Sequence, residues 1–194
     1  PDRAVLVPGG TETELLELAD GRVLYVCRKE GPDDGWGTDI GIAPAHDLLD
    51  VTWRSLPEKC DSPLLVRHRS GVRLITRRQL AFGGRFDHGW TLGSNLLRTR
   101  AYQASYSLTR KRTAVYDVDL PDGPGADLGL THLGDLPSRG DTAFAAVVDA
   151  DGGDPIEADR WTVYNYTSPL DGPDLPWLAS QFRPTEIVAV DVDL

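Results

Sequence analysis

The chain has 194 residues and a net charge of −10, so it is long enough for one domain with a core of its own. Its 20 glycines and 14 prolines favour many turns over long helices. The negative charge disfavours nucleic acid as a partner, because acidic surroundings repel a phosphate backbone. No apolar run approaches the roughly 20 residues of a membrane span, so no membrane partner is expected. No signal peptide opens the chain, which slightly favours the cytoplasm.

The first predicted unit is a hairpin followed by two more strands. Arg3–Val7 predicts a short strand before it. Glu14–Leu18 and Arg22–Val26 then flank a turn that ends in glycine, where a positive φ is needed. A loop rich in Gly, Asp and Pro follows, and Thr38–Ile42 and Leu48–Arg54 complete the unit.

The second unit repeats this pattern. Leu64–Arg67 and Val72–Thr76 predict another hairpin around a turn that contains glycine. Ala101–Leu108 and Thr113–Leu120 follow as a second pair of strands. A soft connection rich in Gly and Pro, Pro121–Gly140, then leads to the third unit.

The third unit is again a hairpin, with a longer turn. Ala143–Val148 and Trp161–Tyr166 form it, and Glu186–Asp193 closes the chain as an alternating strand. Trp177–Phe182 predicts a helical turn. Ser94–Arg100 is too short and too basic to count as a helix, so no long helix is expected.

The three hairpins share polar ends. Each first strand starts with an acid and a hydroxyl: Glu12-Thr13, Asp61-Ser62 and Asp141-Thr142. Each second strand ends in a polar row: Arg28-Lys29-Glu30, Arg77-Arg78-Gln79 and Tyr164-Asn165-Tyr166-Thr167-Ser168. The start and the end of an antiparallel pair are neighbours, so we expect these six segments to meet on one axis.

This repetition predicts an all-β fold, a single domain over residues 1–194. Three four-stranded antiparallel blades, roughly 11–56, 60–120 and 140–194, would form a β-propeller-like array. A β-sandwich with the same turn spacing is the alternative. Since known propellers have four to eight blades, we expect either a fragment of a larger ring or a homodimer that closes one.

Short motifs in the second and third units resemble a known family. Asp61–Leu65 with Leu74–Arg78 resembles a blade of the sialidase-like and glycosidase-like β-propellers, and Pro137–Thr142 with Val163–Ser168 resembles a later blade. The resemblance implies a central pocket for a carbohydrate or a similar polar ligand. The chain departs from the family in carrying none of its common Ser-x-Asp-x-Gly-x-x-Trp turns.

Glycoside hydrolysis needs two carboxyl groups, one protonated and one ionised. Asp61 and Asp141 are the best catalytic pair, because each starts an inner strand and precedes a hydroxyl, and Glu30 is a third candidate. Sialidase-type chemistry would instead use Tyr164 or Tyr166, activated by Glu30. The structural alternative is that each Asp binds the backbone of the turn before it.

Seven further residues are predicted to bind the ligand: Arg28, Arg77, Arg78, Glu12, Tyr164, Asn165 and Tyr166. The guanidinium groups suit a carboxylate or a phosphate. A basic segment supports this, because residues Ser62 to Tyr116 include ten arginines and one lysine but only one acid, Asp87. Alternatively, Arg28 and Arg77 pair with the acids and tie one blade to the next, and the tyrosines pack in the core.

No metal and no cofactor is expected. Cys27 and Cys60 have no metal spacing and predict a pair of buried thiols, with a disulfide as the alternative. The four histidines share no spacing of metal ligands, and Asp87-His88 near Arg85 is the one weak exception.

Two functions follow from these features. The first is a carbohydrate-related propeller whose acid- and Arg-lined axial pocket hydrolyses glycosides. The second is a non-catalytic propeller that binds a small polar or anionic ligand, or a partner protein. A saccharide is the expected ligand under the first, and the sequence names no particular one.

Overall fold

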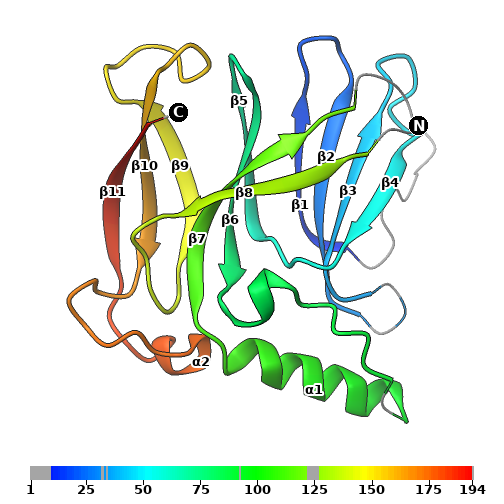
Figure 1. Ribbon diagram of the computed structural model, residues 1–194, viewed down its shortest axis with the longest axis vertical. Coiled ribbons are helices and arrows are strands. Elements are labelled where there is room, and N and C mark those ends of the chain that lie inside the picture. Colours follow the sequence, from blue (N-terminus) through cyan, green and yellow to red (C-terminus); the bar gives the residue numbers. More distant parts are fainter. Residues whose placement is uncertain (1–9, 32, 34, 92, 122–126, 194) are drawn as a thin grey trace, which may run out of the picture.

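The computed structural model describes residues 10–31, 33, 35–91, 93–121 and 127–193. The strand predicted at Arg3–Val7 lies outside these residues. Strands account for 49% of the structure and helices for 12%, and the strands form three antiparallel sheets (Figure 1). The all-β prediction is therefore confirmed.

Each sheet pairs strands that follow one another along the chain. The first sheet has the order β1-β2-β3-β4, with β1 (Gly10–Glu17), β2 (Val23–Lys29), β3 (Thr38–Ala43) and β4 (Thr52–Leu56). The second has the order β5-β6-β7-β8, with β5 (Asp61–His68), β6 (Gly71–Gln79), β7 (Lys111–Asp119) and β8 (Gly129–Asp135). The third has the order β11-β10-β9, with β9 (Ala143–Asp149), β10 (Arg160–Thr167) and β11 (Glu186–Asp193). The helical elements are η1 (Ala81–Gly84), α1 (Asn95–Ser107) and α2 (Trp177–Ser180).

All three predicted hairpins are present, and each has an irregular start. The pairing register shifts near the first residues of β1, β5 and β9. Ser62, Ala143 and Phe144 have positive φ angles of 49°, 140° and 51°, a backbone region that residues other than glycine rarely adopt. Bulges of this kind re-aim side chains, so the hairpin starts are places where the alternation of a regular strand is broken.

The prediction of a strand at Ala101–Leu108 is wrong, because this stretch belongs to the helix α1. The helix begins after Ser94, whose hydroxyl accepts a hydrogen bond from the backbone N–H of Leu97. Tyr102 and Tyr106 lie four residues apart, hence on one face of the helix, and Tyr102 is buried. Ser94–Arg100 was therefore wrongly excluded as a helix.

Two further predictions about the strands need correction. The stretch predicted as a soft connection, Pro121–Gly140, contains β8, which pairs with β7 through the sequence Gly129–Asp135. The third sheet has three strands rather than four within the described residues.

The second sheet forms the middle of the molecule. One core cluster joins it to the first sheet, with Leu24 and Ile40 against Leu74 and Tyr116. Another joins it to the third sheet, where Ile75 packs with Trp161 and Val163. The central strands β2 and β6 are buried on both faces, which explains the continuous apolar run of β2, whereas β6 also buries polar side chains such as Thr76 and Arg77.

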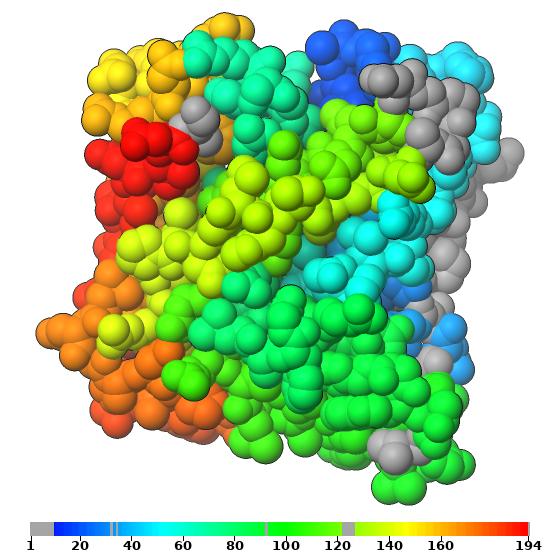
Figure 2. All heavy atoms as spheres, viewed as in Figure 1, coloured from blue at the N-terminus to red at the C-terminus, as the bar shows by residue number. Residues whose placement is uncertain are grey.

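The helices α1 and α2 lie at the same end of the molecule (Figure 1). The hairpins β1–β2, β5–β6 and β9–β10 begin and end there as well. The space-filling view shows the segment of β7 and β8 as a yellow-green band across one face, between the first and third sheets (Figure 2). Among the described residues, no helix has the length and apolar character to cross a membrane.

Candidate functional site

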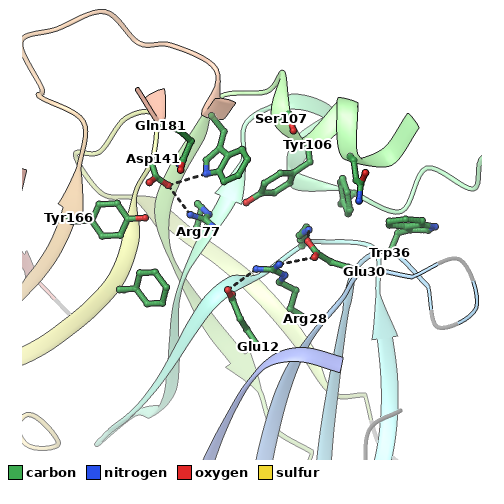
Figure 3. Close-up of a pocket in the computed structure, with 15 residues that line it drawn as sticks. Glu12, Arg28, Glu30, Trp36, Arg77, Tyr106, Ser107, Asp141, Tyr166 and Gln181 are labelled. Carbon is green, nitrogen blue, oxygen red and sulfur yellow. Dashed lines mark hydrogen bonds and ion pairs between the residues drawn. The ribbon is translucent and has the colours of Figure 1, made fainter. Parts of the chain in front are cut away.

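A pocket of about 550 Å³ lies where the three hairpins begin and end, next to α1 and α2 (Figure 3). It draws residues from all three sheets. Six of the residues predicted from the sequence line it: Glu12, Arg28, Glu30, Arg77, Asp141 and Tyr166. The expected convergence of strand starts and ends at one place is thus observed for these six side chains.

Asp61 lies under the pocket rather than in its wall. Its side chain is 1% exposed, and its carboxylate faces three cations. Arg28 Nε lies 3.3 Å away, Arg77 Nε 3.6 Å and Lys59 Nζ 3.7 Å. The hydroxyl of Tyr106 donates a hydrogen bond to the same carboxylate. A ligand in the pocket would therefore meet the groups around Asp61 and not Asp61 itself.

Acids and arginines alternate in a chain that crosses the three sheets. In the first sheet, Arg28 binds Glu12 at 2.7 Å, and it reaches across to Asp61 of the second sheet. Arg77 of the second sheet contacts Asp61 and then Asp141, at the start of the third sheet, at 3.1 Å. This arrangement matches the alternative role predicted from the sequence for Arg28 and Arg77, in which these arginines pair with acids and connect one sheet to the next.

A second set of contacts surrounds Tyr106 of α1. Two lysine side chains lie over its ring, with Lys59 Nζ 4.2 Å and Lys111 Nζ 3.7 Å from the ring centroid, and burial lowers the pKa of Lys111 to about 7. Lys59 also binds Glu30 in an ion pair. A cation over the face of a ring is attracted by its quadrupole. Lys111 of β7 also donates a hydrogen bond to the backbone carbonyl of Tyr106, so these contacts hold α1 against the second sheet.

Two of the three candidate catalytic acids are held in the ionised form. Burial alone would raise the pKa of Asp61, but Lys59, Arg77 and Arg28 outweigh it and lower the pKa. Burial also opposes ionisation of Glu30, and again the charge and hydrogen bond of Lys59 lower the pKa below its usual value. A general acid needs the opposite shift.

The candidate nucleophile Tyr166 is held in its neutral form. Burial and the nearby carboxylate of Asp141 raise the pKa of Tyr166 to about 12. A tyrosine nucleophile would need a lowered pKa or an adjacent free base. Asp141 is already engaged, because its Oδ1 accepts hydrogen bonds from Arg77 and from the indole N–H of Trp177 at 3.0 Å.

Two acids of the site are more exposed than its cations, whereas Asp141 is 16% exposed, as is Arg28. The side chains of Glu12 and Glu30 are 35% and 33% exposed, whereas those of Arg77 and Lys59 are 7% and 2% exposed. Arg77 and Lys59 thus lie in the floor, each bound to acids, and the carboxylates that a ligand would meet are those of Glu12 and Glu30.

Aromatic rings make up the rest of the wall, and sequence reasoning missed most of them. They are Trp36, Phe86, Tyr106, Phe144, Tyr166 and Trp177. Phe144 and Tyr166 stack with ring centroids 6.0 Å apart. The helices also bring three polar side chains, Gln103, Ser107 and Gln181. The four-residue spacing of Tyr102 and Tyr106 was the available signal for α1, but nothing in the sequence placed that helix over the hairpin ends.

Three predicted ligand-binding residues lie outside the pocket. Arg78 points to the opposite face of the sheet, where its guanidinium binds Asp135 at 2.6 Å. Tyr164 is exposed on the third sheet. Asn165 is buried and donates a hydrogen bond to the hydroxyl of Thr142 at 3.1 Å. Alternation of side chains along a strand turns Arg78 and Asn165 away from the pocket, because they are the neighbours of Arg77 and Tyr166. Tyr164 shares the face of Tyr166, but the pairing register of the strand shifts between the two.

Cys27 and Cys60 are free, buried thiols, as predicted. His88 lies outside this pocket in an aromatic cluster, with its ring 4.6 Å from those of Phe82 and Trp90. No group of three His, Cys, Asp or Glu side chains within the described part of the chain is arranged to hold a metal ion.

Comparisons of the chain with protein-family models, with curated proteins and with solved structures find no match.

Proposed function

We propose that the pocket binds a neutral saccharide without hydrolysing it, and that the three sheets are blades of an open propeller-like array. The observation that carries the proposal is the composition of the pocket wall. Exposed carboxylates of Glu12 and Glu30 stand opposite aromatic rings, among them Phe144, while the cations lie in the floor. Three sheets of similar topology with one pocket at their common end support the propeller-like arrangement.

A sugar ring matches both kinds of surface. Its hydroxyl groups donate hydrogen bonds to carboxylate oxygens, and bonds to a charged acceptor are among the stronger ones. Its C–H groups carry partial positive charge and pack on the negative face of an aromatic ring. Glu12 and Glu30 can supply the first contact, and Phe144, Tyr166 or Trp177 the second.

Charge argues for a neutral ligand rather than an anion. Arg28 and Arg77, the expected anion clamp, already bind acids on both sides. An anion would have to displace those carboxylates and pass the more exposed acids. The cost of leaving a buried charge unpaired makes such a displacement unfavourable.

Binding is favoured over hydrolysis because none of the candidate catalytic acids, Asp61, Asp141 and Glu30, is placed to act as a proton donor. Inversion and retention both need one protonated carboxylic acid. Asp61 is buried, and the pKa of Asp61 and that of Glu30 are lowered, so neither suits the role of proton donor. Asp141 shares its oxygen with Arg77 and Trp177.

A glycan array followed by calorimetry on the best ligands tests this proposal. We expect binding that changes tryptophan fluorescence, because Trp36 and Trp177 line the pocket. Glu30→Gln should weaken binding by roughly 10–100-fold, since a hydrogen bond to a charged group contributes about 1.5–3 kcal/mol. Phe144→Ala should weaken it by about 2–10-fold through loss of the ring contact.

Phe182→Ala is the matched control, because this ring is 84% exposed and lies outside the pocket. It should leave the affinity unchanged. Absence of binding across the array, or an equal loss in Phe182→Ala, would overturn the proposal. Release of reducing sugar from a glycoside panel that Asp141→Asn abolishes would establish hydrolysis in place of binding.

A further inference from the structure

A second hollow of about 360 Å³ adjoins the pocket and runs between the first strands of the three sheets. Glu12 and Thr13 of β1 form one side, Leu64 of β5 lies in it, and Phe144 and Ala145 of β9 form the other side. Glu12 and Phe144 line both the hollow and the pocket, so the two spaces meet at these side chains. Together they make an elongated site.

The residues at the junction are held in an unusual backbone conformation. Phe144 has a φ of 51° and a side chain that is 67% exposed. Ser62, at the start of β5, has a φ of 49°, and its backbone N–H donates a hydrogen bond to Glu12 at 2.6 Å. Strain of this kind costs about 1–3 kcal/mol for each residue and tends to occur at functional sites. Here it presents an aromatic ring to solvent at the point where the pocket opens into the hollow.

We propose that this elongated site binds an oligosaccharide, with one unit in the pocket and the following units in the hollow between β1 and β9. The proposal rests on the saccharide-binding function of the pocket and extends it to the class of ligand, a chain rather than a single sugar. Phe144 lies between the two subsites and would contact units on both sides.

Glu14 is the polar group that the hollow offers to the second unit. It lies two residues after Glu12, so both carboxylates are on the same face of β1. Glu12 is bound by Arg28 and by the backbone of Ser62. Glu14 forms no ion pair within the described part of the chain, and burial raises the pKa of its carboxyl group. Sugar hydroxyls would satisfy this half-buried group, and Pro63, Leu64 and Ala145 offer C–H surface beside it.

Affinity as a function of chain length tests the proposal. The probes are cello- and chito-oligosaccharides of one to four units, together with short chains of whatever sugar the array selects, all titrated by calorimetry. We expect the three-unit chain to bind at least about tenfold more tightly than the single sugar. Glu14→Ala should remove most of that gain while leaving the single sugar's affinity unchanged. Glu17→Ala, on the opposite and exposed face of β1, should change neither value.

The failures of the two proposals are distinguishable. Two outcomes would overturn the extended site alone. In the first, a single sugar binds and longer chains bind no more tightly. In the second, longer chains do bind more tightly, but this gain survives both Glu14→Ala and Ala145→Trp, a change that fills the hollow. Absence of binding by every sugar and chain overturns the pocket's function as well. A fluorescence spectrum and an unfolding midpoint close to the parent values show that each variant is folded, so that a loss of binding reports on the site.

Discussion

Asp61 is the residue on which the site depends, although a ligand in the pocket would not touch it. Its buried carboxylate lies within 3.7 Å of three cations: Arg28 of the first sheet, Arg77 of the second, and Lys59 of the connection between the two sheets. Without its charge, three positive groups would remain in the floor of the pocket with less compensation. The Asp61 carboxylate holds Arg28 and Arg77 in place, and these arginines in turn bind Glu12 and Asp141.

Replacing Asp61 by Asn should lower the free energy of unfolding by about 3–5 kcal/mol, the usual result of removing one partner from a buried ion pair. Urea unfolding followed by tryptophan fluorescence measures it. Asp159→Asn is the matched control, because Asp159 is 79% exposed in its pair with Arg69 and such pairs contribute about 0–1 kcal/mol. Equal losses in the two variants would show that Asp61 has no special structural role.

The helix α1 is the element that closes the site, and it is attached by one face only. Tyr102 stacks on Trp36 with ring centroids 4.2 Å apart, and its hydroxyl accepts a hydrogen bond from the backbone N–H of His88 at 3.0 Å. Tyr106, one turn later, contacts Lys59. The other face carries exposed leucines such as Leu97.

Replacing Tyr102 by Ala should therefore loosen α1 without unfolding the sheets. We expect a loss of about 3–5 kcal/mol in the stability of this region, as for large aromatic-to-alanine changes in a core. Hydrogen exchange followed by mass spectrometry should show faster exchange in residues 95–107 and little change in β6 or β10. Leu97→Ala on the same helix should change exchange little, and uniform acceleration across the sheets in Tyr102→Ala would contradict an independently attached helix.

At the scale of the whole molecule, paired acids connect stability to pH. The pKa values of Asp61, Glu30, Asp135 and Asp174 are lowered in the folded state, because in each case the charges and hydrogen bonds of cationic partners outweigh the opposing effect of burial. A depressed folded pKa means that the unfolded chain binds more protons at acid pH. The corresponding stability is fully present above the ordinary values of 3.8 and 4.5 and is lost as pH falls through the folded pKa values.

The free energy of unfolding should therefore decline steadily below about pH 4.5, the upper of the two ordinary values. Urea titrations between pH 7 and pH 3 measure it. Asp61→Asn should flatten part of this decline, because one depressed carboxyl group is gone. A stability that stays constant to pH 3 in the parent protein would contradict the network as the source of pH dependence. Glu14, whose pKa is raised by burial, contributes an effect of the opposite sign.

Local patterns predicted most of the strands and six of the fifteen residues that line the pocket. The turns with glycine between alternating strands identified the three hairpins, and an acid before a hydroxyl marked Glu12, Asp61 and Asp141 at their starts. Arg28 and Arg77 followed from the polar strand ends. Arg78, Tyr164 and Asn165 were misplaced because a bulge and the alternation of side chains decide which neighbour faces the pocket.

The sequence by itself determined the β-rich character and the three hairpins, because strand alternation and turn chemistry act between residues close in the chain. Only the tertiary structure decided where α1 lies, since Tyr102 and Tyr106 pack against rings and lysines that are distant in the chain. The tertiary structure also decided that Asp61 is a buried counter-ion of Arg28, Lys59 and Arg77. It decided as well that the carboxylates of Glu12 and Glu30 are the more exposed ones in the pocket. Those properties depend on which sheets pack together, and long-range packing is not encoded in any one stretch of residues.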